Sequence, residues 1–401
     1  MNNETPKGNR PHLAVFGKRN SGKSSFINAF IDQDLSIVSS TPGTTTDPVE
    51  KAYELQPFGP VVLIDTAGID DAGDLGQKRI ARTRKVLDRT DFAFLLVEDN
   101  QIGQYEAELI AVFLDKKIPW VIILNKEDLL TLPDLDRYIA DIKANTGGFV
   151  LSCSTLKKPG LEKIKAYTAE ILGSITPLIA DLVAPPDTVV LVVPIDKEAP
   201  QGRLILPQVQ VMRELLDADT SCVVVKEKGL DYTLNNVLKI KPKLVVTDSQ
   251  AFLEVDANVP GDILMTSFSI LFARQKGDLR QYVEGVKAID NLQNGDNVLI
   301  AELCSHRPIG EDIGRVKIPR WLKQYKGVTP NFEFAVGKDF PDDLSKYKLI
   351  IQCGGCMVNR QLILSRIARA RSQNIPITNY GVTIAYLFGI LDRAVKSFSL
   401  S

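Results

Sequence analysis

The segment Gly17–Ser24, "GKRNSGKS", restricts the folds open to this chain more than any other stretch. It has the spacing G-x-x-x-x-G-K-[ST] and lies between the apolar run "LAVF" and the helix-like run "SFINAFI". In this strand–loop–helix context, glycines let backbone N–H groups face a phosphate, and the helix N-terminus adds positive charge. The pattern predicts a nucleotide-binding α/β domain in which Lys23 contacts the β- and γ-phosphates and Ser24 binds Mg²⁺.

Two further motifs follow predicted strands in the order expected of a nucleotide switch. "DTAG" begins at Asp65, whose carboxylate can hold the Mg²⁺ shell, and ends at Gly68, whose N–H can contact the γ-phosphate. "NKED" spans Asn125–Asp128 after "WVIIL". Asp128 can accept hydrogen bonds from both N1–H and N2–H of guanine, which adenine lacks. The sequence therefore predicts GTP rather than ATP as the nucleotide.

Weaker signals complete the predicted GTP site. "SCS", residues 152–154, is typical of a loop that contacts the base, and "STPGTTTDPVE" is an expected switch segment. Within that switch, Thr45 is the predicted Mg²⁺-binding threonine.

The rest of the chain repeats the alternation of apolar runs and helix-like stretches. At 401 residues it is long enough for two or three domains, and its 44% hydrophobic and 24% charged residues are ordinary for a globular protein. "TVVLVVPID", "SCVVVKE", "PKLVVTDSQ" and "DILMTS" form a second series; "NVLIAELC", "NFEFAVG", "KLIIQC" and "IPITN" form a third. We predict an α/β fold with mainly parallel sheets: a P-loop GTPase domain (1–174), a linker (175–186), a middle α/β domain (187–277) and a third α/β domain (278–401).

Composition argues against several classes of protein. The formal net charge of −1 gives no general reason to expect nucleic-acid or anionic-membrane binding. No apolar stretch reaches the ~18–20 residues needed to span a bilayer. The polar start "MNNETPKGNRP" lacks the apolar core of a signal peptide, so we expect a cytoplasmic protein. Five cysteines, an odd number, favour buried thiols or metal ligands over disulfides.

Three of these cysteines follow predicted strands. Cys304 and His306 form "CSH" after "NVLIAEL", and Cys353 and Cys356 form "CGGC" after "KLIIQ". Open α/β sheets gather ligands at the carboxyl ends of their strands. The spacing leaves four interpretations open: a structural zinc site, a thioredoxin-type dithiol, a 4Fe–4S cluster on three thiolates, or buried structural cysteines.

A helix and many basic residues surround these cysteines in the sequence. We expect a helix to begin near Met357 with Leu364, Ile367 and Ala368 on one face, and its N-terminus would favour thiolates. The basic residues form either a solvated face or a positive rim for an anionic group. They are Arg315, Lys317, Arg320, Lys323, Lys326, Arg360, Arg366, Arg369 and Arg371.

The nucleotide motifs resemble those of translation-factor-related GTPases, and most closely the tRNA-modification GTPases with "P-G-T-T-x-D" switches. Ile69 follows "DTAG" where Ras-type enzymes have a water-orienting glutamine. Asn20 stands where the tRNA-modification group has a potassium-coordinating asparagine. The resemblance implies that K⁺ acts where an arginine finger would, on a dimerised domain; alternatively, Asn20 is only a tolerated loop residue.

The whole chain resembles the GTP-binding scaffold family of iron–iron hydrogenase maturation, described by the signature C-x-H…H-C-x-x-C. Cys304, His306, Cys353 and Cys356 match it, whereas Gln352 occupies the place of the second histidine. The resemblance implies a carrier of a 4Fe–4S cluster that takes a diiron precursor from radical-SAM maturases to the hydrogenase apoprotein, and a homodimer. It leaves the fourth cluster position to His306, a carboxylate such as that of Asp339, water or the cargo.

These arguments give one set of predicted site residues and two alternative functions. The nucleotide-binding residues are Gly17, Asn20, Ser21, Gly22, Lys23, Ser24, Ser25, Asp65, Gly68, Asn125, Lys126, Asp128, Ser152 and Cys153. The catalytic residues are Lys23, Thr45, Gly68 and Asn20, with Mg²⁺ at Ser24 and Thr45, K⁺ at Asn20 and the cluster at Cys304, Cys353 and Cys356. The alternatives are a GTPase regulator with structural zinc and a tRNA-modification GTPase.

Overall fold

The chain divides into two compact units. The computed structural model describes residues 7–31, 49–66, 83–174, 176–194, 204–303, 312–337 and 339–398, and of Lys158 only the backbone. The first unit comprises Met1–Ile175 and Asn359–Ser365, and the second comprises Thr176–Val358 and Arg366–Ser401.

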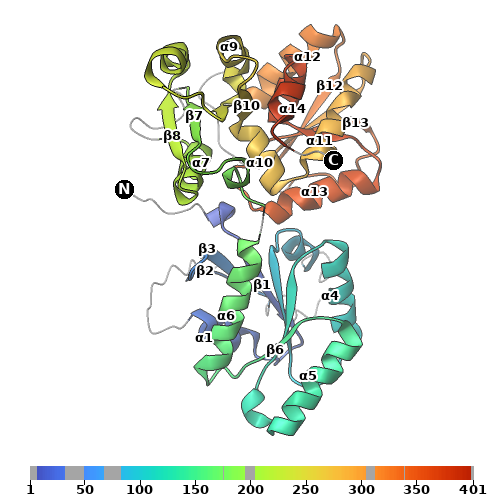
Figure 1. Cartoon of the computed structure of the whole chain (residues 1–401). Helices are drawn as coiled ribbons and strands as arrows, with labels where there is room; N and C mark the ends of the chain where they lie inside the picture. The colour runs from blue at the N-terminus through green and yellow to red at the C-terminus, as the bar shows by residue number, and fades with distance from the viewer. Residues whose placement is uncertain are drawn as a thin grey trace. The chain divides into compact units, whose positions relative to one another are not determined.

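The first unit is built on a six-stranded sheet of order β2-β3-β1-β4-β5-β6 (Figure 1). Only the pairing of β2 with β3 is antiparallel. Its strands are β1 (His12–Gly17), β2 (Val49–Leu55), β3 (Gly59–Asp65), β4 (Phe92–Val97), β5 (Trp120–Leu124) and β6 (Val150–Ser152). Its helices include α1 (Lys23–Ile31), α4 (Gln104–Asp115), α5 (Leu132–Thr146) and α6 (Lys158–Gly173).

Two apolar clusters bury the two faces of this sheet. In β1, Leu13 and Val15 belong to one cluster, whereas Ala14 and Phe16 belong to the other. Successive side chains of a strand point to opposite faces, so a strand covered on both sides must be apolar throughout. This is why the short continuous apolar runs of the sequence become central parallel strands.

The second unit contains two four-stranded parallel sheets, of order β10-β9-β7-β8 and β12-β11-β13-β14. The strands are β7 (Thr188–Val192), β8 (Ser221–Val225), β9 (Leu244–Thr247), β10 (Leu264–Ser267), β11 (Asn297–Glu302), β12 (Asn331–Val336), β13 (Tyr347–Gln352) and β14 (Ile377–Asn379). The main helices are α7 (Leu206–Asp217), α9 (Phe252–Asn258), α10 (Phe268–Lys276), α11 (Leu279–Val286), α12 (Ile318–Lys326), α14 (Tyr380–Leu387) and α15 (Leu391–Val395), and the part of α13 (Arg360–Ser372) that begins at Arg366.

The predicted α/β fold class with mainly parallel sheets is confirmed, and each apolar run interpreted as a strand is one. The prediction for the helix after "CGGC" was wrong in two details. α13 begins at Arg360 rather than near Met357, because a turn in which the N–H of Val358 donates to the carbonyl of Gly355 comes first. Ala368 is exposed, because the buried face of α13 runs through Ile363, Ile367 and Ala370.

The segment 175–186, expected to be a linker, is attached to α7. The carboxylate of Glu214 accepts hydrogen bonds from the backbone N–H groups of Leu178, Ile179 and Ala180 at 3.1, 2.7 and 2.8 Å. Leu178 and Ile179 are also buried. Across the part of the chain that the structure describes, no helix is both long and apolar enough to cross a bilayer.

Candidate functional site

The phosphate loop joins β1 to α1 in the first unit and is closed around Lys23. The Lys23 Nζ donates to the carbonyls of Gly17 and Lys18 at 2.7 and 2.8 Å, and the residue is only 5% exposed. Gly17, Asn20 and Gly22 have φ angles of +152°, +66° and +86°. A Cβ at Gly17 would lie 2.6 Å from the carbonyl oxygen of Leu96, so glycine is required there by space as well as by φ.

Two of the three side chains expected around the magnesium ion, those of Ser24 and Asp65, lie together. The Ser24 hydroxyl donates to the Asp65 Oδ2 at 2.7 Å, although the residues are 41 positions apart. Parallel pairing of β1 with β3, in which Val15 aligns with Asp65, brings the end of β3 beside the loop that follows β1. A hydroxyl and a carboxylate at this separation form an oxygen pair suited to Mg²⁺.

Asn125 connects the phosphate loop to the predicted base-binding loop. Its Nδ2 donates to the carbonyl of Ser21 at 3.0 Å, and its backbone N–H donates to Val97. The Sγ of Cys153 lies 3.7 Å from the Asn125 Oδ1, and burial raises the pKa of the Cys153 thiol to about 12. Cys153 therefore supports the loop as a neutral, buried thiol, while Asn125 fixes the loop's distance from the phosphate loop.

Ser154 also belongs to this site, although it is not among the nucleotide-binding residues predicted from the sequence. Its side chain forms a hydrogen bond with Asp128, which holds the pKa of this exposed carboxyl below its ordinary value. Its Oγ also accepts from the backbone N–H of Leu156 at 3.1 Å. The motif "SCS" contained the signal, but which serine faces Asp128 depends on where β6 ends. Ser154 thus orients the carboxylate predicted to select guanine.

The remaining nucleotide-site residues lie nearby or outside the described residues. Lys126 has a φ of +60°, and its Nζ donates to Glu98 at 2.6 Å and to the carbonyl of Asn20 at 3.4 Å. Ser25 is exposed on α1, and Ser152 ends β6. Thr45 and Gly68 lie outside the described residues.

The second candidate site is the cysteine loop at the end of β13. The Cys353 Sγ accepts a hydrogen bond from the backbone N–H of Leu303 at 3.1 Å, and the N–H of Cys353 donates to Ala301 on β11. Cys353 and Cys356 are half-buried and form no disulfide. Leu303 immediately precedes Cys304, so the chain enters the "CSH" segment beside the sulfur of Cys353. Cys304 and His306 themselves lie outside the described residues.

Gln352, in the place of the second histidine of the family signature, faces the sheet interior. It is fully buried, and its Nε2 donates to the Tyr282 hydroxyl at 3.0 Å. Asp339, suggested as a fourth ligand, is exposed just after β12. Among the described residues, no group of three or more His, Cys, Asp or Glu side chains could hold a metal ion.

The basic residues do not form one solvated face. Arg315 is paired with Glu302, Arg371 with Asp278, and Arg369 with Asp342. Arg366, expected on the outer surface of its helix, is instead 3% exposed. The description of these residues as a solvated face is therefore wrong for Arg366, because α13 turns that side chain inward toward Gly337 and Phe340.

The cysteine loop has the chemistry that an anionic thiolate cluster requires. Cys353 and Cys356 supply soft sulfur donors, and an N–H group points at the sulfur of Cys353. In the part of the chain that the structure describes, two buried N–H groups of Arg366 have no hydrogen-bond partner. These residues therefore fit an iron–sulfur cluster, with Cys304 as the expected third ligand.

Models of known domains match three successive parts of the chain. The 50S ribosome-binding GTPase model matches residues 12–126, the hydrogen maturase F dimerization domain matches residues 178–277, and the hydrogen maturase F tetramerization domain matches residues 280–397. The last two models together span more than half of the sequence. This chain belongs to the hydrogen maturase F family. Its first unit contains the GTPase domain, and its second contains the family's two oligomerisation domains.

Curated relatives resemble this family member only in part. The tRNA modification GTPase MnmE of Moorella thermoacetica is 33% identical over 179 residues, which are 42% of this chain and 38% of that protein. GTPase Der of Chlamydia pneumoniae is 30% identical over 168 residues, 40% of this chain and 34% of that protein. The chain thus spans little more than a third of the length of these relatives.

Solved structures that resemble the chain also match only part of it. Era of Aquifex aeolicus bound to GDP and AlF4⁻ is 20% identical, covers 40% of this chain and 56% of its own, and has a TM-score of 0.34. The G domain of the iron transporter FeoB of T. maritima is 22% identical, covers 41% of this chain and 99% of its own, and has a TM-score of 0.32.

Replacing Ser154 with alanine should weaken guanine-nucleotide binding. The loss of one hydrogen bond to Asp128 should decrease the affinity about two- to tenfold, because the carboxylate would no longer be oriented toward the base. Isothermal titration of GDP into the full chain measures it, and Thr155→Ala in the same loop is the control. Equal affinity of Ser154→Ala and the parent would show that Asp128 is oriented without Ser154.

Proposed function

We propose that this protein is a GTP-hydrolysing scaffold that holds a 4Fe–4S cluster and delivers a diiron precursor to iron–iron hydrogenase. The observation that carries the proposal is the cysteine loop. Its thiols lie at the carboxyl edge of a parallel sheet, and its sulfur accepts an N–H from the residue before Cys304, in a chain of the hydrogen maturase F family.

In the proposed GTPase reaction, Lys23 neutralises charge on the β- and γ-phosphates from the centre of the phosphate loop. Ser24 and Asp65 hold Mg²⁺ directly and through its water shell. Asp128, oriented by Ser154, accepts the two N–H groups of guanine. Thr45 would complete the magnesium shell, and the N–H of Gly68 would contact the γ-phosphate. The protein would thus position and electrostatically stabilise the γ-phosphoryl group while water forms a bond to it and the bond to the β-phosphate oxygen breaks, giving GDP and phosphate.

The proposed role of Asn20 is to hold K⁺ against the phosphates, since no glutamine follows "DTAG" to orient water. Its left-handed backbone, with φ of +66°, is a conformation that asparagine adopts more readily than most residues. Asn20 is exposed, so its side chain is accessible to an ion and nucleotide.

In the proposed cluster site, Cys304, Cys353 and Cys356 would hold the cluster as thiolates. When bound, the cluster supplies an iron with a labile position next to which a diiron unit can be held. The amide of Gln352 is engaged with Tyr282, which supports leaving the fourth position to His306, Asp339, water or the cargo. A labile position suits a carrier, because a site capped by four permanent protein ligands could not easily release cargo.

The proposed partners follow from the carrier role. Radical-SAM maturases would supply the diiron precursor and the hydrogenase apoprotein would receive it, in the cytoplasm. We propose neither nucleic acid nor membrane as a partner, and the near-neutral charge supports this.

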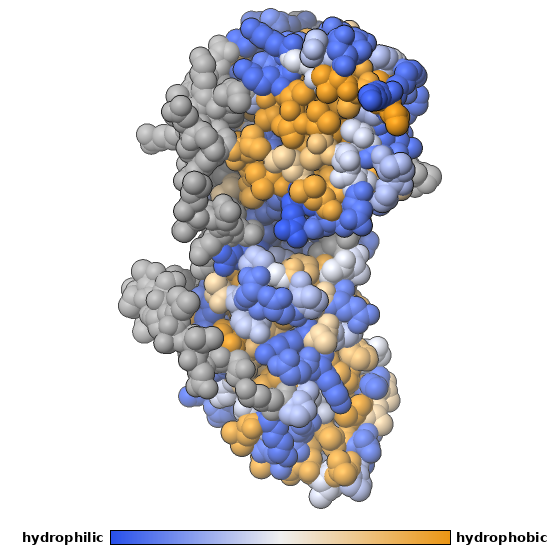
Figure 2. Space-filling view, turned by 60° about the vertical axis from the view of Figure 1, so that its left-hand side comes forward, coloured by the Kyte–Doolittle hydropathy of each residue, from blue (hydrophilic) through white to orange (hydrophobic). Residues whose placement is uncertain are grey.

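A second copy of the chain is the remaining proposed partner. β8 is an edge strand, and edge strands present unpaired backbone groups that a second strand can bind. Val209 and Leu216 on α7 and Val224 on β8 are 44%, 62% and 43% exposed. Figure 2 shows apolar side chains gathered on one face of the unit that carries these elements. Both features favour a homodimer formed through the middle domain.

Two variants should separate the two chemistries. Lys23→Ala should abolish GTP hydrolysis but leave iron and sulfide content unchanged, whereas Cys353→Ser should lose the cluster but retain GTP turnover. Phosphate release and iron and sulfide analysis of anaerobically reconstituted full-length protein provide the measurements, with electron paramagnetic resonance of the reduced cluster. Equal loss of cluster in both variants would contradict the separation of the sites.

The same preparation distinguishes the alternative functions. Zinc in place of iron, with no absorbance band near about 400 nm, would replace the scaffold by a GTPase regulator with structural zinc. Salt-sensitive RNA binding would favour the tRNA-modification activity named for the partial relatives.

Exchange of K⁺ for Na⁺ tests Asn20. GTP turnover should fall by at least about tenfold in Na⁺, since electrostatic stabilisation of the transferred phosphoryl group by one positive charge commonly exceeds that factor. Asn20→Ala should turn over slowly in both salts. If the parent enzyme is equally fast in Na⁺ and K⁺, Asn20 does not hold a catalytic cation.

Val224→Lys tests the dimer. A lysine on the edge strand should repel a second copy and lower the mass measured by light scattering from that of a dimer to that of a monomer. Leu253→Lys is the matched control, because Leu253 is also exposed, at 54%. It lies on α9, which connects β9 to β10 at the edge of the sheet opposite β8. A dimer that persists in Val224→Lys would place the contact elsewhere.

A further inference from the structure

Arg366 on α13 is a buried cation whose hydrogen-bonding capacity is only partly used. Its side chain is 3% exposed, one guanidinium nitrogen donates to the carbonyl of Gly337, and the guanidinium carbon lies 4.7 Å from the centre of the Phe340 ring. Its Nε and Nη1 have no partner among the described residues. Buried N–H groups in folded proteins are nearly always paired, so these two point to an acceptor beside Arg366.

Arg366 lies at the same edge of the sheet as Cys353. Gly337, whose carbonyl accepts from Arg366, donates its N–H to Glu302 at the end of β11. The next residue, Leu303, donates to the Cys353 Sγ. Burial lowers the pKa of Arg366 to about 10, and the negative charge of a Cys353 thiolate acts in the opposite direction. The guanidinium is therefore charged at neutral pH and lies within electrostatic reach of the sulfur. Within the described ranges, Arg366 is not ion-paired with a carboxylate.

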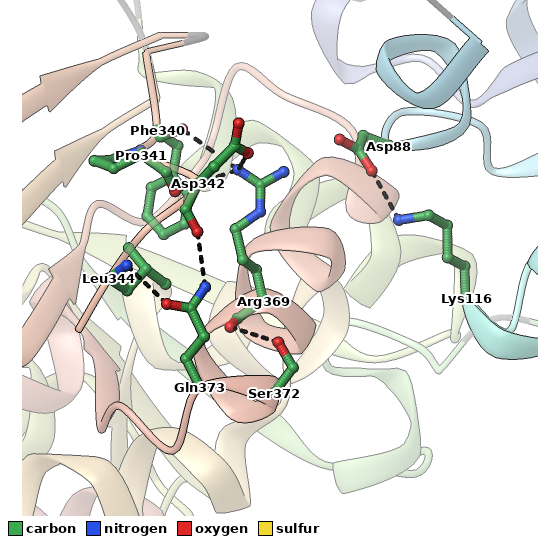
Figure 3. Close-up of polar contacts among 9 residues, drawn as sticks. All are labelled: Asp88, Lys116, Phe340, Pro341, Asp342, Leu344, Arg369, Ser372 and Gln373. Carbon is green, nitrogen blue, oxygen red and sulfur yellow. Dashed lines mark hydrogen bonds and ion pairs between the residues drawn. The ribbon is translucent and has the colours of Figure 1, made fainter. Parts of the chain in front are cut away.

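Its neighbour on the same helix shows the contrast. Arg369 also lies over Phe340, at 5.7 Å, but it donates to the carbonyls of Phe340 and Pro341 and pairs with Asp342 at 2.9 Å. Figure 3 shows this arginine directed at Asp342 and away from the rest of the helix. Arg369 is thus paired with a carboxylate at the surface, whereas Arg366 has no carboxylate partner within the described ranges.

A second buried cation supports the loop from another element. Lys276, at the end of α10, is 7% exposed, and its Nζ donates to the carbonyls of Gly355 and Val358 at 3.2 and 2.9 Å. The surroundings of Cys353 thus combine a lysine, an arginine and the N–H of Leu303. Donors and positive charges in a buried site are the environment that favours an anion.

We propose that Arg366 is a positioning residue that holds a fixed positive charge near Cys353, and thereby raises the reduction potential of the cluster bound there. The inference rests on the proposed cluster site. Reduction adds an electron to an already anionic thiolate cluster, so a nearby buried cation stabilises the reduced state more than the oxidised state. Hydrogen bonds to cluster sulfurs act in the same direction.

The test is a redox titration of anaerobically reconstituted full-length protein, followed by electron paramagnetic resonance. Arg366→Met and Arg366→Gln should lower the ratio of reduced to oxidised cluster at least tenfold at a fixed potential, a shift of about 59 mV for one electron. Arg366→Lys, which keeps the charge, should restore most of the potential. Arg369→Gln is the matched control and should titrate as the parent does.

The outcomes separate this inference from the function on which it rests. A parent protein that takes up zinc or no cluster would overturn both. A parent with a cluster, and uncharged Arg366 variants with equal iron content and an unchanged potential, would overturn the inference alone. Circular dichroism identifies any variant that fails to fold, and the methionine and glutamine variants provide two independent uncharged side chains. An equal shift in Arg369→Gln would also overturn the inference, because it would show that losing any positive charge on this helix lowers the potential.

Discussion

Parallel pairing of buried strands is the constraint on which both candidate sites depend. In the first unit, Val15 aligns with Asp65 and Leu124 with Ser152, so loops more than a hundred residues apart follow strands that end at one edge of the sheet. In the second unit, Ala301 aligns with Gln352, which places the residues before Cys304 beside Cys353. Because both faces of a parallel sheet are covered by other elements, polar side chains gather at the carboxyl ends of its strands.

Both edges also carry a buried cation, and its burial needs a physical reason. Moving an ammonium or guanidinium group from water into a protein interior costs on the order of several kcal/mol, unless partners replace the lost hydration. Lys23 is held by two loop carbonyls, and Lys276 by two others. The carbonyl groups that accept these hydrogen bonds carry no negative charge of their own. A phosphate at Lys23, and an anionic cluster near Lys276 and Arg366, would bring a negative charge to each site.

The sequence was most informative where burial alone decides the structure. Continuous apolar runs such as "LAVF" predicted central strands, because a strand covered on both faces must be apolar throughout. β2 was missed because "VEKAYEL" alternates charged with apolar residues on an edge, and the start of α13 because the turn before it depends on distant Lys276. Ser154 and the inward direction of Arg366 were missed for the same reason, since both depend on contacts between distant segments.

The burial of Gln352 bears on how a carrier could release its cargo. The side chain of Gln352 is fully buried and reaches the Tyr282 hydroxyl. Its amide nitrogen is already engaged, and a neutral amide is a weak ligand for iron compared with a thiolate or imidazole. In the proposed cluster site, stable ligation would therefore fall to the cysteines, and the remaining iron position would be filled by a group that can leave. A glutamine at position 352 would then favour exchange over permanent closure of the proposed site.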